Sequence, residues 1–70
     1  MIEKYLPKTY EGRMAHIAEE CAEVIMAYAK MQRFGANHSH PISKERNIDA
    51  FHRELKDLKD IIEIFEDNHP

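Results

Sequence analysis

Two long segments of this chain carry apolar residues at alternating steps of three and four, the spacing that places side chains along one face of a helix. In residues 10–34 the apolar series is Met14, Ile17, Cys21, Val24, Tyr28 and Met31. In residues 45–66 it is Ile48, Phe51, Leu55, Leu58, Ile62 and Phe65. Residues 35–44, with the sequence GANHSHPISK, have the composition of a loop. The pattern predicts two long helices joined by this loop.

Residues that favour helix ends flank both segments. Residues 1–9 form a short lead-in, and Thr9 is suited to cap the first helix. Gly35 follows the first helix directly, as a C-cap glycine does. Ser43 or Asn47 is expected to cap the second helix, which the sequence DNHP ends after about residue 66.

The length of 70 residues allows a single domain, residues 1–70. Because 43% of the residues are hydrophobic, two helices packed only on each other would leave much apolar surface in water. We therefore expect an all-α fold: a hairpin of two long antiparallel helices that oligomerises into a four-helix bundle. Cys21, the single cysteine, cannot form an intramolecular disulfide, and its place on the apolar stripe predicts a buried small side chain.

The charge balance argues against some partners. A net charge of −3 does not suit a protein that binds a nucleic-acid polymer through its phosphates. No segment approaches the length of about 20 apolar residues that a transmembrane helix needs, and the first residues do not have the pattern of a signal peptide. The expectation is a cytoplasmic protein that does not bind membranes.

Acidic residues lie beside the apolar stripes of both predicted helices. Glu20 and Glu23 are three positions apart, as are Glu54 and Asp57, so each pair shares a helix face. Glu54 and Asp57 also interrupt an apolar row that continues to Ile61. Carboxylates next to a buried stripe repel one another unless a cation joins them, and oxygen ligands suit Mg²⁺. The alternative is that these acids are ordinary charges on solvated helix faces.

The order of these residues resembles a known family. The sequences EECAE at 19–23 and ELKD at 54–57 are similar to the EExxE…ExxD signature of the MazG-like, all-α nucleoside triphosphate pyrophosphohydrolases. The sequence KMQRFG at 30–35 resembles a KxxRFG run of small, often phage-encoded members, and Asn47 resembles the Asn that opens their second motif helix. The similarity spans residues 14–62.

The resemblance implies a helical dimer or tetramer that hydrolyses a (d)NTP or related nucleotide to the monophosphate and pyrophosphate. Mg²⁺ would be the cofactor, with Mn²⁺ as a substitute, and a phage-encoded member would act in the host cytoplasm. The implied Mg²⁺ ligands are four acids that also form the catalytic set: Glu20, Glu23, Glu54 and Asp57. Glu19 would be an auxiliary catalytic acid. Lys30, Arg33 and Asn47 would bind the phosphates or the sugar of the substrate.

Two departures from the family pattern leave alternatives open. Lys56 stands where the family usually has Gly, so it could either contact phosphate or point into water. The chain is also short for the family, and a complete nucleotide pocket would then need a second subunit. The alternatives are a helical oligomer that binds or sequesters nucleotides without cleaving them, an enzyme similar to phosphoribosyl-ATP pyrophosphohydrolase, and a purely structural oligomer.

Overall fold

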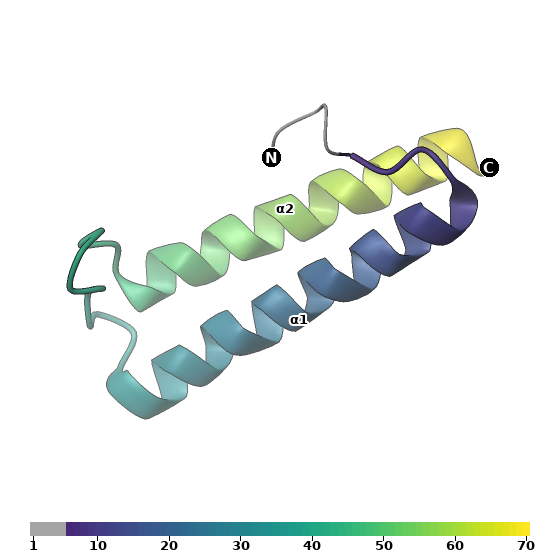
Figure 1. Ribbon diagram of the computed structural model, residues 1–70. Helices are drawn as coiled ribbons and strands as arrows, with labels where there is room; N and C mark the ends of the chain where they lie inside the picture. Colours follow the sequence, from purple (N-terminus) through teal and green to yellow (C-terminus); the bar gives the residue numbers. More distant parts are fainter. Residues whose placement is uncertain (1–5) are drawn as a thin grey trace.

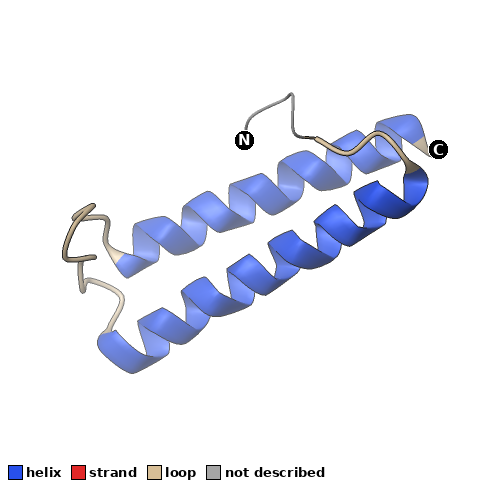
Figure 2. Cartoon of the chain, viewed as in Figure 1, coloured by secondary structure: helices blue, strands red, loops and turns tan. Residues whose placement is uncertain are grey.

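A computed structural model describes residues 6–70 of the chain, so residues 1–5 of the predicted lead-in lie outside the described part. Helix α1 spans Tyr10–Phe34, the same residues as the first predicted helix, and helix α2 spans Asn47–Asn68. The two helices run antiparallel and contact each other along their length (Figure 1). Figure 2 shows that the rest of the described chain is loop and turn. The prediction of an all-α antiparallel hairpin is confirmed.

Both ends of α1 have the predicted caps. The backbone N–H of Gly12 donates to Thr9 Oγ1 at 3.0 Å. A Cβ at position 12 would lie 2.9 Å from that hydroxyl oxygen, so glycine leaves the space that the cap occupies. At the other end Gly35 has φ of 97°, a conformation that glycine adopts with little strain, and its N–H donates to Met31 O. Thr9 and Gly35 therefore define the limits of α1.

The beginning of α2 differs from the prediction of a helix over 45–66. Neither Ser43 nor Asn47 is the N-cap: the cap position is Arg46, which makes no side-chain cap hydrogen bond. Ser43 Oγ instead accepts from the N–H of Glu45 at 3.3 Å. The Asn47 side chain is turned toward α1, where its tertiary contacts outweigh the local capping preference. The helix starts at Asn47 and ends at Asn68, two residues later than predicted at each end.

The face of α1 that packs on α2 is rotated from the predicted stripe. Within the described part of the chain, the buried apolar residues are Ala27, which is 7% exposed, and Ile61, which is 3% exposed. The stripe prediction is right for Ile17, Val24 and Met31, which are half-buried, and wrong for three other members, which are exposed: Met14, Cys21 and Tyr28. The line that faces α2 instead includes Glu20 and Ala27. Apolar residues cover more than half of the circumference of α1, so periodicity alone could not select the side that α2 covers.

The position of Cys21 differs from the prediction. The sequence predicts a buried thiol, whereas the structure leaves Cys21 exposed on the side of α1 that α2 does not cover. The same rotation that exposes Cys21 turns Glu20 toward α2, because adjacent positions on a helix point about 100° apart. The exposed thiol and the inward carboxylate are therefore two results of one helix orientation.

The loop of residues 35–46 is two residues longer than predicted, and backbone hydrogen bonds hold it in shape. His40 N–H donates to Glu45 O, and Asn47 N–H donates to His38 O, both at 2.9 Å. Ser39 and Arg46 form an isolated antiparallel bridge. These contacts fold the loop back over the end of the hairpin (Figure 1). Neither described helix is long and apolar enough to cross a membrane.

Candidate functional site

The structure brings three of the predicted acids together between the helices. Glu20 of α1 and Glu54 and Asp57 of α2 each offer a carboxylate oxygen, and these oxygens lie within 4.8 Å of one another. The Glu20 side chain is 17% exposed and that of Glu54 is 13% exposed. We call these three residues the acidic group. Its members are half-buried at the contact between α1 and α2.

The positions of these acids follow from helix geometry. Glu20 lies three residues after Ile17 and four before Val24, so it shares the half-buried face of α1. On α2, Asp57 lies four residues before Ile61, the most buried apolar residue described. The apolar contacts therefore fix the rotation of each helix, and that rotation aims the acids at each other.

The acidic group carries more negative charge than its neighbours neutralise. Two ionised carboxylates 4.8 Å apart repel each other by roughly 3 kcal/mol at an effective dielectric constant of about 20. Arg53 Nη1 lies 2.9 Å from Glu54 Oε1, and His16 Nε2 lies 3.3 Å from Glu20 Oε1. Arg53 is the one permanent cation paired with the group among the described residues. The arrangement can thus attract a further cation.

Two predicted acids stay apart from this group. Glu19 and Glu23 are both exposed on α1, and neither belongs to the set of converging carboxylates in the described chain. Glu23 follows Glu20 by about one turn, on the side of the helix that turns toward solvent. Lys56 does not reach inward either, because its ammonium group pairs with Asp60 at 2.9 Å on the exposed side of α2.

A cavity of about 540 Å³ lies under the loop, at the end of the hairpin where α1 stops and α2 starts. Its lining combines cationic, aromatic and polar side chains from both helices and the loop. The lining residues are Lys30, Phe34, His38, His40, Pro41, Ser43, Glu45, Asn47, Ala50 and Arg53. The volume falls within the ~300–1,000 Å³ typical of small-molecule sites.

The three residues predicted to bind the substrate have different places around this cavity. Lys30 lines it with an exposed side chain. Asn47 also lines it, but its Nδ2 donates to Gly35 O at 3.0 Å and to Lys30 O at 3.4 Å. With those donors engaged, Asn47 can offer a ligand only its carbonyl oxygen, which does not suit a phosphate. Arg33 lies outside the lining, with its guanidinium 4.8 Å from the centroid of the Phe34 ring.

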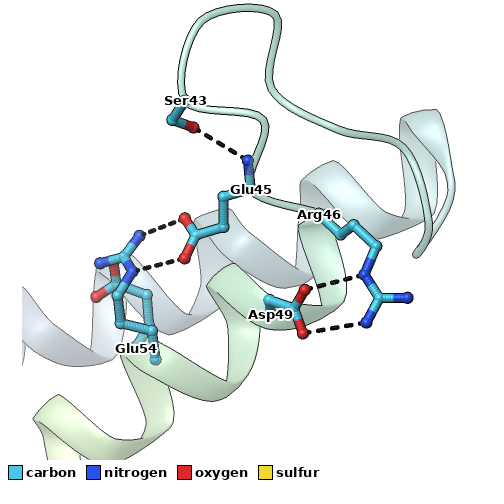
Figure 3. A network of polar contacts seen from close by, with 6 residues as sticks. Ser43, Glu45, Arg46, Asp49 and Glu54 are labelled. Carbon is cyan, nitrogen blue, oxygen red and sulfur yellow. Dashed lines mark hydrogen bonds and ion pairs between the residues drawn. The ribbon is translucent and has the colours of Figure 1, made fainter.

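Arg53 is a site residue that the sequence prediction missed, and it joins the cavity to the acidic group. Its Nε and Nη2 each donate to a carboxylate oxygen of Glu45 at 3.1 Å, while Nη1 donates to Glu54. Figure 3 shows the carboxylate of Glu45, from the loop, pointing toward the part of α2 that carries Glu54. The hydrogen bonds from Arg53 hold the pKa of Glu45 below its ordinary value, and Glu45 raises the pKa of Arg53. The position of Arg53 directly before Glu54 could have indicated its contact with that acid. Its loop partner Glu45 lies eight positions away, so the sequence did not indicate that contact.

A second ion pair holds the start of α2. Arg46 donates through Nε and Nη2 to the two carboxylate oxygens of Asp49, at 2.9 and 3.3 Å (Figure 3). These hydrogen bonds lower the pKa of Asp49 from its ordinary value. Arg46 Nη1 also donates to Asn37 Oδ1 at 3.2 Å, so this pair fastens the loop to the helix without entering the cavity.

Comparisons with known protein families, with curated proteins and with solved structures found no match to this chain. The order of the motif residues, the acidic group and the cavity are therefore the features that bear on function. Three carboxylates that approach one another could hold a hard divalent cation, and the adjacent cavity has cationic, acidic, polar and aromatic side chains in its lining.

Proposed function

We propose that this protein is a Mg²⁺-dependent nucleoside triphosphate pyrophosphohydrolase of the MazG-like kind, which releases a nucleoside monophosphate and pyrophosphate. The observation that carries the proposal is the convergence of Glu20, Glu54 and Asp57 from two helices. In the sequence these residues are members of the EExxE…ExxD pattern. The convergence explains why acids at those two places would be needed together.

The donor set fits Mg²⁺. The acidic group offers only carboxylate oxygens, which are the ligands that Mg²⁺ prefers, and it has no sulfur ligand. Mg²⁺ commonly uses a few carboxylates and completes its coordination with water and substrate phosphates. Glu20, Glu54 and Asp57 would hold the ion. Glu23 remains a predicted ligand that lies outside the group in the single chain.

The residues around the acidic group would have distinct tasks. Bound Mg²⁺ supplies charge neutralisation for the triphosphate and activation of water for attack. His16 orients the Glu20 carboxylate through its 3.3 Å contact. Lys30 would bind phosphate oxygens with its mobile ammonium group, and Arg53 with the N–H groups of Nη1 and Nη2 that its bonds to Glu45 and Glu54 leave free. A carboxylate of the site would take the proton of the attacking water, with Glu19 as the predicted auxiliary acid.

We also propose that two or more copies assemble into a four-helix bundle. The side of α1 away from α2 exposes large apolar residues, with Met14 and Ile25 near one line and Ile25 67% exposed; Tyr28, 51% exposed, lies at the edge of this stripe with its ring 6.4 Å from that of Phe51 of α2. A second copy could cover this stripe through a two-fold interface, in which the same patch serves on both chains. Substitution of Ile25 by Glu should then yield monomers in light scattering, whereas Ile42→Glu, at an exposed loop position, should leave the oligomer intact.

The test of the proposed activity is release of pyrophosphate from the common NTPs and dNTPs, with Mg²⁺ or with a chelator. We expect turnover only with the metal, and loss of turnover in Glu20→Gln and Asp57→Asn with unchanged helical content. Glu63→Gln is the matched control, because Glu63 is exposed on α2 outside the acidic group. Full turnover in either acidic-group variant would refute the assignment of these residues.

The same experiment separates the enzyme from a protein that only binds nucleotides. A binder would be stabilised against unfolding by Mg²⁺ and nucleotide together, since any ligand that prefers the folded state raises stability. It would release no pyrophosphate. If neither stabilisation nor turnover were observed, the acidic group would have only a structural role. The proposed place of action is the cytoplasm, where Mg²⁺ and nucleotides are available.

A further inference from the structure

The cavity under the loop lies next to the acidic group but shares no residue with it. We propose that this cavity binds the nucleoside end of the nucleotide, with the base against the paired rings of Phe34 and His38. The 5′-phosphate would then lie between Lys30 and Arg53, and the remaining phosphates would extend toward the acidic group. The choice of a nucleotide rests on the proposed function, whereas the position of the base rests on the cavity itself.

The aromatic part of the lining provides the stacking surface. Phe34 is 53% exposed although it is a large apolar residue, and it lines the cavity. The His38 ring lies 5.8 Å from the Phe34 ring, centroid to centroid, at an angle of 31°. Phe34 and His38 both line the cavity, whereas Arg33, whose guanidinium lies over the Phe34 ring, does not. A planar base would extend the stack and cover apolar surface.

The polar part of the lining gives the ligand a direction. Lys30 and Arg53 are the two permanent cations of the cavity, and Arg53 also contacts Glu54. A rise of 1.5 Å per residue puts Glu54 about 6 Å along α2 from Ala50 in the cavity wall. Phosphates attached to a nucleoside in the cavity would therefore run past Arg53 toward the acids. The free carbonyl oxygen of Asn47 could accept from a sugar hydroxyl or a base N–H.

The cavity is formed before any ligand enters. The His40 side chain accepts at Nδ1 from the N–H groups of Ile42 and Ser43, at 3.1 and 3.2 Å, which holds the turn closed. The two hydrogen bonds from Arg53 to Glu45 tie the loop to α2. A loop already held in place loses less conformational freedom when it binds a ligand, so more of the contact energy appears as affinity.

The experiment is a titration of the full chain with nucleoside monophosphates in buffer that contains a chelator. Binding is monitored through the chemical shifts of the backbone amides. Without metal, the acidic group cannot recruit the phosphates through an ion. We expect shifts concentrated at residues 30–50 and an affinity about tenfold higher for AMP or CMP than for ribose 5-phosphate, because stacking requires a base. Equal affinity for ribose 5-phosphate, or shifts away from the loop, would overturn the proposal.

Two variants test the contacts separately. Phe34→Ala should weaken AMP binding by about tenfold and affect ribose 5-phosphate little, since it removes the stacking surface. Ile42→Ala is its control, being an exposed loop residue outside the lining. Lys30→Gln should weaken both ligands, whereas Lys59→Gln, exposed on α2, should weaken neither. If Phe34→Ala binds AMP like the unaltered chain, the base does not lie on this surface.

Steady-state kinetics separates this inference from the proposed enzyme activity. In the active enzyme, Phe34→Ala should raise KM for the NTP several-fold and change kcat little, because the residue lies away from the acids. If NTPs are cleaved and Phe34→Ala leaves KM unchanged, the cavity inference fails and the pyrophosphohydrolase stands. If no nucleotide is cleaved but AMP still shifts the loop amides, the cavity inference stands and the catalytic proposal fails.

Discussion

Asp57→Asn should make the metal-free protein more stable, although it alters a half-buried residue. The substitution keeps the size of the side chain and removes one charge from three carboxylates whose oxygens lie within 4.8 Å. Each repulsion that is removed is worth about 1 kcal/mol if water screens it fully and about 3 kcal/mol at an effective dielectric constant of about 20. Asp57 faces two such neighbours, Glu20 and Glu54. We expect a gain of about 2 kcal/mol, near the screened limit.

With Mg²⁺ present, the unaltered chain should instead be more stable than Asp57→Asn. A ligand at about ten times its Kd adds roughly 1.4 kcal/mol to the free energy of unfolding of the protein that binds it. The unaltered chain should therefore gain stability as Mg²⁺ is added. Asp57→Asn lacks one of the three ligands and should gain little. A charge that destabilises the empty protein and is needed for the metal is the signature of a binding site.

The assay is urea unfolding followed by far-UV circular dichroism, with chelator or with MgCl₂ at matched ionic strength. Asp60→Asn is the matched control one turn away, because Asp60 pairs with Lys56 on the exposed side. Loss of this ion pair in Asp60→Asn should lower the free energy of unfolding by a few tenths of a kcal/mol, as for other exposed pairs. The gain in stability on adding Mg²⁺ should be unchanged. The reasoning is refuted if Asp57→Asn lowers the stability of the metal-free protein or responds to Mg²⁺ as the unaltered chain does.

Three further predictions concern the fold and the loop. Ile61→Ala, at the most buried apolar position, should lower the free energy of unfolding by about 3 kcal/mol in the same assay, and an unchanged midpoint would contradict the packing described. Asn47→Ala should cost about 2 kcal/mol, because two carbonyl groups of α1 and its cap lose their donor; an effect below about 0.5 kcal/mol would be inconsistent with those bonds. The lowered pKa of Glu45 means that its pair with Arg53 contributes stability above the ordinary glutamate pKa of about 4.3 and loses it as the pH falls through the folded-state pKa. The protection of the loop amides, taken relative to their intrinsic exchange rate at each pH, should fall over that acidic range, and Glu45→Gln should remove this pH dependence; persistence in the variant would assign it to another group.

The extent of the helices could be read from the sequence because their signals are local. The cap hydrogen bond of Thr9 and the positive φ of Gly35 involve residues within one turn of the ends of α1. The start of α2 was mispredicted where a distant contact took over. Asn47 is an acceptable cap by composition, yet its amide donates to Lys30 O and Gly35 O, which are seventeen and twelve positions away.

For the candidate site, the prediction of which helix face is packed was likewise right for α2 and wrong for α1. Periodicity placed Glu54 and Asp57 on the apolar row of α2, and the structure has them facing α1. For α1, periodicity favoured a stripe through Cys21, whereas the packed side passes through Glu20 and Ala27. A helix with apolar residues around most of its circumference has several faces that could be buried, so local spacing does not distinguish them.

Residue order along the chain was thus enough to predict two helices, the caps of the first helix, a connecting loop and two clusters of acids. Which side of α1 meets α2, and so which acids converge, depended on how the side chains fit across the hairpin. The loop cavity likewise exists only when both helices and the loop are in place, and the Glu45–Arg53–Glu54 link only when the loop folds back on α2. The physical reason is the sequence separation over which each interaction acts. Caps and helical periodicity involve residues a few positions apart, whereas packing and ion pairs join residues that are distant in the sequence.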